Sequence, residues 1–99
     1  MLNIEKQLQN DALTVSLEGR LDTTTAPALE AELKSALDGV KSLTLDLEKL
    51  EYISSAGLRV LLYAQKQMNI AGEMKIKNAN ETVMEIFDVT GFSDILTIE

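Results

Sequence analysis

Apolar and polar residues alternate in several short runs of this chain, which is the pattern of strands that bury one face. Four such runs occur, at 2–8, 13–17, 43–48 and 73–77. Asn10 and Asp11 separate the first two runs and have the chemistry of a tight turn. We therefore expect an N-terminal antiparallel hairpin, with Gly19 ending its second strand, and two further strands.

Between and after these runs, apolar residues recur at the three- and four-residue spacing of amphipathic helices. Three segments show this spacing, at about 26–37, 55–70 and 81–90. We expect the hydroxyls of 23–25 to cap the first helix, with Pro27 in its first turn and Gly39 directly after it. Asn80 and Gly91 mark the two ends of the third helix in the same way. The chain then ends in a predicted helical turn and a tail or edge strand.

The expected order of elements is β-β-α-β-α-β-α. Strands joined through helices should run parallel, so we predict an α/β fold with a small mixed sheet, in which parallel strands follow the hairpin. Because the strands alternate, the helices should pack mainly on one face. We expect a single domain over 1–99. The exit loops of the second and third strands, 19–25 and 52–57, then bring Asp22 and Ser55 to one edge.

Composition excludes several classes of function. The net charge is −7 and the basic residues are scattered, so we expect no nucleic-acid binding. The chain has no cysteine and no histidine, which removes disulfides and the usual zinc ligands, so we expect no resident metal and no cofactor. Without a histidine base, Ser55 is not a hydrolase nucleophile, and we predict that the chain is not an enzyme.

The chain shows neither a signal-peptide pattern nor an apolar run that approaches the roughly 18 residues of a membrane span. We therefore expect no membrane insertion and a cytoplasmic location.

The turn from the third strand into the second helix carries Ser54 and Ser55. Backbone N–H groups at a helix start lack intrahelical partners and favour negative charge, so a phosphate on Ser55 would fit there without breaking the fold. Two serines at a helix start are otherwise simply caps, and we assign that role to Ser54. We predict that Gly57 lets the helix and a strand approach closely.

Taken together, these segments resemble the STAS family, and within it the bacterial anti-sigma factor antagonists, over nearly the whole chain. The segment 19–22 (Gly-Arg-Leu-Asp) resembles the family's Gly-Glu-Leu-Asp, and 87–92 (Phe-Asp-Val-Thr-Gly-Phe) resembles its Phe-Asp-Ile-Thr-Gly-Leu. The segment 54–58 (Ser-Ser-Ala-Gly-Leu) resembles its Asp-Ser-Ser/Thr-Gly-Leu switch motif. This register places the family's phosphorylated serine on Ser55. Two positions depart from the motif, because Ser54 replaces the aspartate and Ala56 replaces the second hydroxyl residue.

The resemblance implies that the unmodified chain binds an anti-sigma factor that is also a serine kinase, which frees a sigma factor for transcription. Phosphorylation of Ser55 ends this binding, and a metal-dependent serine phosphatase resets the cycle. The alternative is a STAS scaffold that does not switch, such as a docking subunit of a transporter or a signalling complex. The two departures favour the scaffold, whereas the retained Ser55 favours the switch.

The candidate switch and partner-binding residues are Asp22, Thr23, Ser54, Ser55, Ala56, Gly57, Arg59 and Tyr63. In the family the acid at Asp22 lies beside the phosphorylated serine, where it would position the kinase or bind a metal during reset; an ordinary turn acid is the alternative. Arg59, Tyr63 and Lys66 form a row on the exposed side of the second helix. Such a row is usually a solvated face, but it starts beside Ser55 and contains residue types enriched at binding hot spots.

Overall fold

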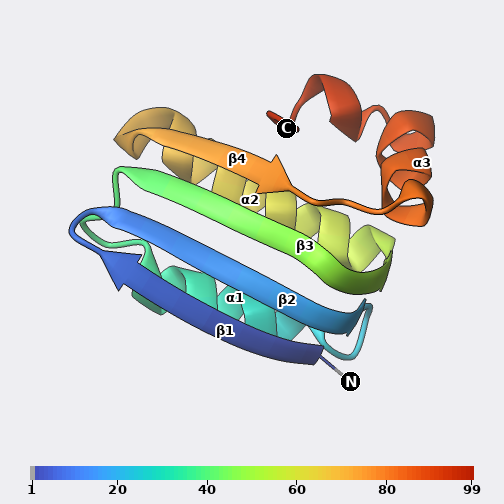
Figure 1. Cartoon of the computed structure of the whole chain (residues 1–99), viewed down its shortest axis with the longest axis horizontal. Helices are drawn as coiled ribbons and strands as arrows, with labels where there is room; N and C mark the ends of the chain where they lie inside the picture. The colour runs from blue at the N-terminus through green and yellow to red at the C-terminus, as the bar shows by residue number, and fades with distance from the viewer. Residues whose placement is uncertain (1) are drawn as a thin grey trace.

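The four strands form one sheet in the order β1-β2-β3-β4 (Figure 1). The structure, a computed structural model, describes residues 2–99. Its elements are β1 (Leu2–Gln9), β2 (Ala12–Leu21), α1 (Ala26–Ala36), β3 (Ser42–Ile53), α2 (Ser55–Ala71), β4 (Glu73–Lys77), α3 (Glu81–Thr90) and a final 3-10 turn (Phe92–Asp94). β1 runs antiparallel to β2, whereas β2, β3 and β4 are parallel neighbours. The predicted order of elements and the predicted mixed sheet are confirmed.

The hairpin between β1 and β2 has the expected turn but a longer second strand. Gln9 pairs with Ala12, so the turn contains two residues, and Asn10 adopts a left-handed conformation with φ 59°. The prediction that Gly19 ends the second strand is wrong, since β2 continues to Leu21. Gly19 has φ 109° and lies beside a shift in the pairing with β3, where its backbone freedom accommodates the irregularity.

β3 extends to Ile53, so Tyr52 and Ile53 of the predicted exit loop 52–57 belong to the strand. The register between β3 and β2 shifts by one residue at two places, once before Gly19 and once after it. At each of these slips β3 has one residue more than β2, as in a β-bulge. The slips interrupt the alternation after Leu47 and return Leu50 and Ile53 to the core. For this reason the alternating pattern alone placed the end of the strand too early.

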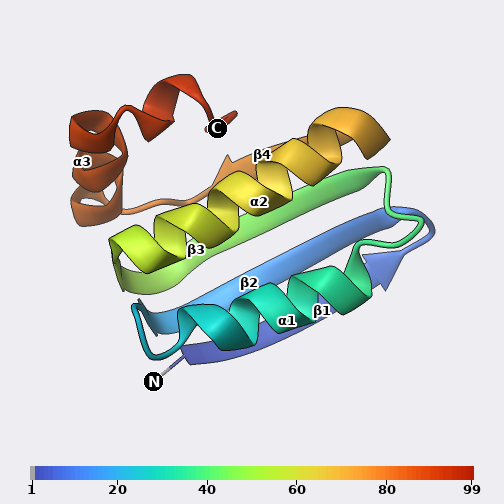
Figure 2. The same ribbon diagram turned by 180° about the vertical axis from the view of Figure 1, so that it is seen from behind.

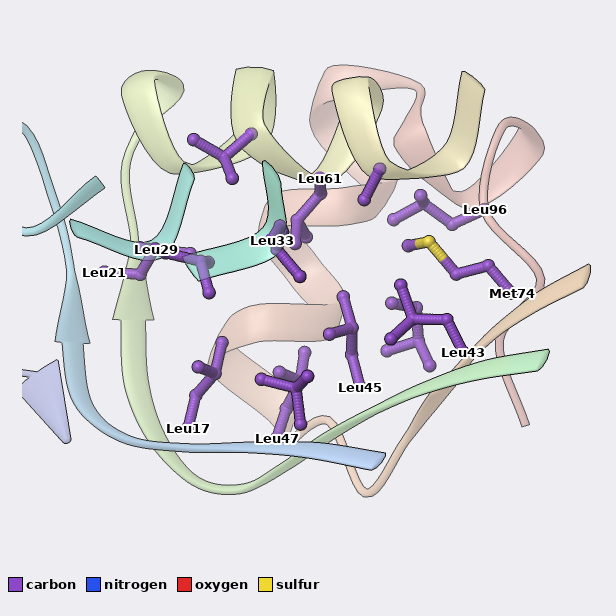
Figure 3. Close-up of a cluster of buried hydrophobic side chains, with 14 of the residues drawn as sticks. Leu17, Leu21, Leu29, Leu33, Leu43, Leu45, Leu47, Leu61, Met74 and Leu96 are labelled. Carbon is purple, nitrogen blue, oxygen red and sulfur yellow. The ribbon is translucent and has the colours of Figure 1, made fainter. Parts of the chain in front are cut away.

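The core lies between the sheet and the two helices that cover it. Figure 2 shows α1 and α2 on the same face of the sheet, whereas α3 lies at the end of the sheet where β3 leads into α2. Leucines from the sheet, from α1 and from α2 fill this layer, among them Leu17, Leu45, Leu29, Leu33 and Leu61 (Figure 3). The intervening strand residues are polar and lie on the other face, which no helix of the described chain covers. The prediction of helices mainly on one face is confirmed.

The ends of α1 differ from the expected ones. Pro27 lies in the first turn as predicted, but Thr25 makes no capping hydrogen bond through its side chain. The helix ends at Ala36, with Leu37 as its C-terminal cap. This end is earlier than predicted, so Gly39, with φ 80°, does not directly follow the helix. The threonine hydroxyl is used elsewhere, in the loop that precedes the helix.

The C-terminal part of the chain matches its prediction. Asn80 caps α3 by accepting a hydrogen bond from Val83 N at 2.8 Å, and Gly91 ends the helix in the left-handed conformation. After the 3-10 turn, Ile98 forms a single parallel bridge to Ile76 of β4. Among residues 2–99, no helix is long and apolar enough to cross a membrane.

Candidate functional site

The ends of β2 and β3 lie side by side and carry the two predicted site segments. Leu21 and Ile53 are the last paired residues of the two strands. Directly after them, Ser54 N donates a hydrogen bond of 2.8 Å to the carbonyl oxygen of Leu21. The loop that begins at Asp22 and the start of α2 therefore meet at one edge of the sheet, as predicted.

Ser54 and Ser55 have different roles at the start of α2. Ser54 is the extended capping residue, and its Oγ accepts a hydrogen bond from Gly57 N at 3.4 Å. Ser55 is the first helical residue and is exposed. The first turn contains no acidic residue. The hydroxyl of Ser55 is thus free of the capping role, and no acidic residue of the first turn neutralises the positive end of the helix.

Gly57 lets the helix touch both strand ends. A Cβ atom at this position would lie 2.7 Å from Leu21 Cγ and 2.8 Å from Ile53 Cγ1, which is closer than side-chain atoms approach. The predicted close approach is confirmed. Ala56, next to it, is partly buried against the core. The start of α2 is therefore fixed relative to the β2 exit loop.

Asp22 is held by the threonines that follow it. Its Oδ1 accepts hydrogen bonds from Thr24 Oγ1 at 2.7 Å, from Thr24 N at 3.0 Å and from Thr25 N at 3.2 Å. These bonds, foremost that from the Thr24 hydroxyl, lower the pKa of the Asp22 carboxyl below its ordinary value. Asp22 N donates in turn to Thr25 Oγ1 at 2.8 Å, which explains why this hydroxyl does not cap α1. The carboxylate is ionised and held in place.

Sequence reasoning missed a cationic neighbour of this carboxylate. Arg20 and Tyr52 are opposite each other on β2 and β3, and the Arg20 guanidinium carbon lies 4.5 Å from the centre of the Tyr52 ring. Arg20 Nε is 4.0 Å from Asp22 Oδ2. The arginine stands where the resembling motif has a glutamate, which was the available signal. Its pairing with Tyr52 depends on the two strand slips and was not readable from the pattern.

The outer row on α2 is only partly as expected. Arg59 and Lys66 are exposed, but Tyr63 is half-buried and lies 5.7 Å from the ammonium of Lys34 on α1. A shallow depression between α1 and α2 lies next to residues 54–57, which we call the switch turn after the motif they resemble. It is lined by Thr23, Ala26, Pro27, Glu30, Ala56, Arg59 and Val60. Three of the predicted partner-binding residues thus share one concave surface, whereas Tyr63 lines a separate depression farther along the two helices.

Comparison with known proteins agrees with this architecture. The model of the STAS domain family matches residues 3–99. A protein of Bordetella bronchiseptica described as "Putative anti-sigma factor antagonist BtrV" is 40% identical over 88 residues, which are 87% of this chain and 76% of that protein. The "Anti-sigma-B factor antagonist" of Bacillus subtilis is 31% identical over 99 residues, covering 98% of this chain and 90% of that protein.

Solved structures show the same fold. An anti-sigma factor antagonist from Mycobacterium paratuberculosis has a TM-score of 0.89 at 21% identity, over 99% of this chain and 85% of that one. The Bacillus cell fate determinant SpoIIAA in its phosphorylated form has a TM-score of 0.75 at 19% identity, over 100% and 91%. The family match over almost all of the sequence, together with the curated relatives, shows that this chain belongs to the STAS domain family.

Proposed function

We propose that this protein is an anti-sigma factor antagonist whose partner is an anti-sigma factor with serine kinase activity. The names of the two curated relatives support the role of anti-sigma factor antagonist. In the proposed cycle, the unmodified chain binds the anti-sigma factor and frees a sigma factor. The chain is the substrate of the kinase and performs no catalysis itself.

The observation that carries the proposal is the position of Ser55. Its side chain is exposed on the first residue of α2, Ser54 provides the cap, and no acidic residue occupies the first turn. A phosphate adds a charge of about −1.5 to −2 at neutral pH. At this helix start the added charge is stabilised by the helix dipole, so phosphorylation is compatible with the folded chain.

Release of the partner follows from where the added charge lies. Thr23, Ala56 and Arg59 line the depression beside Ser55, and we assign this surface to contact with the anti-sigma factor. A phosphate buried without a partner at such an interface costs about 3–5 kcal/mol. This cost corresponds to a loss of about 10²- to 10³-fold or more in affinity.

We assign Asp22 to contact with the modifying enzymes. Its Oδ1 accepts the threonine hydrogen bonds, whereas Oδ2 accepts no hydrogen bond from the described residues and lies 4.0 Å from Arg20 Nε. A fixed, ionised oxygen at the same edge as Ser55 suits the orientation of the kinase. It also suits the metal of a serine phosphatase that removes the phosphate. In this scheme such a metal-dependent phosphatase resets the cycle.

A second candidate function is a STAS scaffold without a switch, within a transporter or a signalling complex. The motif departures at Ser54 and Ala56 favour it, because an aspartate and a second hydroxyl residue are absent from the switch turn. Ser54 nevertheless caps the helix, so the departure at this position keeps the start of α2 intact.

Intact-mass measurement distinguishes the two functions. The purified chain is incubated with ATP and each candidate serine kinase of its source organism. We expect one kinase to add a single phosphate to the wild type and to the Ser54→Ala variant, but none to Ser55→Ala. If no cognate kinase adds a phosphate and the chain instead binds a transporter subunit tightly, the scaffold is the correct function.

A further inference from the structure

The charge of α2 differs from that of the rest of the molecule. The chain has a net charge of −7, yet the 17 residues of α2 contain Arg59 and Lys66 and no acidic residue. α3, in contrast, contains Glu81, Glu85 and Asp88 and no basic residue. α2 is therefore a positive helix on an acidic protein, and its surface is suited to a negatively charged partner.

One side of α2 carries its cations and its exposed apolar residue. Arg59, Tyr63, Lys66 and Ile70 are spaced by three or four positions and so lie along one side of the helix; we call them the α2 stripe. Ile70 is 88% exposed, more than any other large apolar side chain that the structure describes. Nothing in the fold of the described residues requires an isoleucine there.

The cations of the α2 stripe are available for binding. Three lysines on other elements are paired with neighbouring glutamates. Among the ion pairs of residues 2–99, none includes Arg59 or Lys66. Their charge is therefore not neutralised by an acidic side chain of the described chain.

Two separate depressions lie between α1 and α2, one near each end of the helices. The depression next to the switch turn is bounded by Arg59. A second depression, at the other end of α1 and α2, is lined by Leu37, Tyr63 and Ala71 among others. Lys34, which lies 5.7 Å from the Tyr63 ring, also lines it but is paired with Glu30 and adds no unpaired cation. An acidic residue also lines each depression, Glu30 in the first and Asp38 in the second, so the unpaired positive charge of this region is that of the α2 stripe.

We infer that the α2 stripe is a docking surface for an acidic face of the anti-sigma factor kinase. On this inference, the partner places carboxylates opposite Arg59 and Lys66 and an apolar socket opposite Ile70. The inference rests on the proposed function and names the chemistry of the partner surface. Complementary charge accelerates association, and the apolar contact slows dissociation.

An acidic partner also strengthens the proposed switch. Ser55 precedes Arg59 by four residues, so the two side chains are neighbours on the helix surface. A phosphate on Ser55 would lie at the start of the α2 stripe and would offset the charge of its first cation. It would also repel the partner's carboxylates directly, and this repulsion adds to the cost of burying the phosphate.

Association kinetics test the inference on the kinase identified by the mass experiment. We expect Lys66→Glu to lower the association rate constant about tenfold at about 0.05 M salt, with a much smaller difference at about 0.5 M. Ile70→Ser should raise the dissociation rate constant several-fold. The matched control is Lys49→Glu, which makes the same charge change at an exposed position of β3 on the opposite side of the sheet. It should alter both constants by less than about twofold.

Each other outcome contradicts the inference in its own way. If Lys66→Glu associates as fast as Lys49→Glu, the stripe is not the docking surface, although single phosphorylation at Ser55 would still support the proposed function. Faster association of Lys66→Glu would show that the partner face is basic. Sedimentation that reveals a dimer of the wild type, dissociated by Lys66→Glu, would assign the stripe to a second copy of this chain. Absence of kinase binding by the wild type would overturn both the inference and the proposed function.

Discussion

The starts of α2 and α3 have the same cap geometry but a different charge. Each begins after an extended residue whose side chain accepts a hydrogen bond from the backbone N–H three positions later, Ser54 in α2 and Asn80 in α3. The first turn of α3 contains Glu81, whereas that of α2 contains no acid and presents Ser55. Helix starts favour negative charge, and α3 meets this preference with its own glutamate.

The difference shows how the proposed modification site at Ser55 fits the fold without strain. The start of α2 is capped and packed against two strands, but its first turn contains no acidic residue. A phosphate on Ser55 would supply what Glu81 already supplies to α3. On this account, phosphorylation changes what the surface binds and leaves the domain folded.

Among variants at the starts of the two helices, Gly57→Ala is expected to change the free energy of unfolding most. The new methyl group would overlap Leu21 and Ile53, and overpacking of this kind costs about 1–3 kcal/mol. Urea unfolding gives the change in the free energy of unfolding. The matched control is Gly91→Ala at the end of α3, where a Cβ meets no neighbouring atom but the φ of 80° is strained. A loss at position 57 below about 0.5 kcal/mol would mean that the start of α2 is not held by this contact.

The two caps should differ in strength. Asn80→Ala removes the bond from Val83 N at 2.8 Å and the bond from Asn80 Nδ2 to the Leu50 carbonyl at 2.9 Å. Ser54→Ala removes only the longer bond from Gly57 N, at 3.4 Å. We expect costs of about 1–2 and about 0.5–1 kcal/mol, measured by thermal unfolding. Equal costs would show that the α2 cap contributes more than its geometry indicates.

Charge changes at the two helix starts should act in opposite directions. Ser55→Asp adds the missing negative charge and should stabilise the protein by about 0.3–1 kcal/mol, whereas Glu81→Gln removes one and should destabilise it by a similar amount. Both effects should shrink as salt is raised. Denaturant unfolding at low and high salt measures them. Destabilisation by Ser55→Asp would contradict a helix start that favours an anion.

The smallest predicted effect is a pH-dependent loss of stability that arises from the loop at Asp22. Because the pKa of Asp22 is lowered in the folded chain, its contribution to stability is complete above the ordinary value of 3.8 and is lost as the pH falls through the lowered pKa. Wild type and Asp22→Asn are compared by urea unfolding at about pH 6 and about pH 3. The wild type should lose more stability than the variant, whereas parallel losses would show that the threonine bonds do not favour the ionised form.

Much of the fold was readable from the sequence because its signals are local. Strand alternation, helical spacing and the turn chemistry of Asn10 each act over a few residues, and the same holds for the caps at Ser54 and Asn80. The close approach at Gly57 was also predicted, because a residue without a side chain in the first turn of a helix that follows a strand lets the two elements pack tightly.

Most of the remaining features depend on contacts between residues that are distant in the sequence. The slips in β3 follow from its pairing with β2, so neither the end of the strand nor the Arg20–Tyr52 contact was visible in one segment. Thr25 has the residue type of a helix cap, but the Asp22 turn uses its hydroxyl. Tyr63 follows the spacing of an exposed row, yet the neighbouring α1 half-buries it. For the strand, the Arg20–Tyr52 contact and Tyr63, a tertiary partner decided the outcome, whereas the Thr25 contact spans only three residues.

The central claim is that a phosphate on Ser55 ends binding to the anti-sigma factor kinase while the domain stays folded. Isothermal titration of that kinase with the unmodified and the Ser55-phosphorylated chain tests it most directly. We predict a dissociation constant about 10²- to 10³-fold larger for the phosphorylated chain. Equal dissociation constants for the two forms would contradict the account.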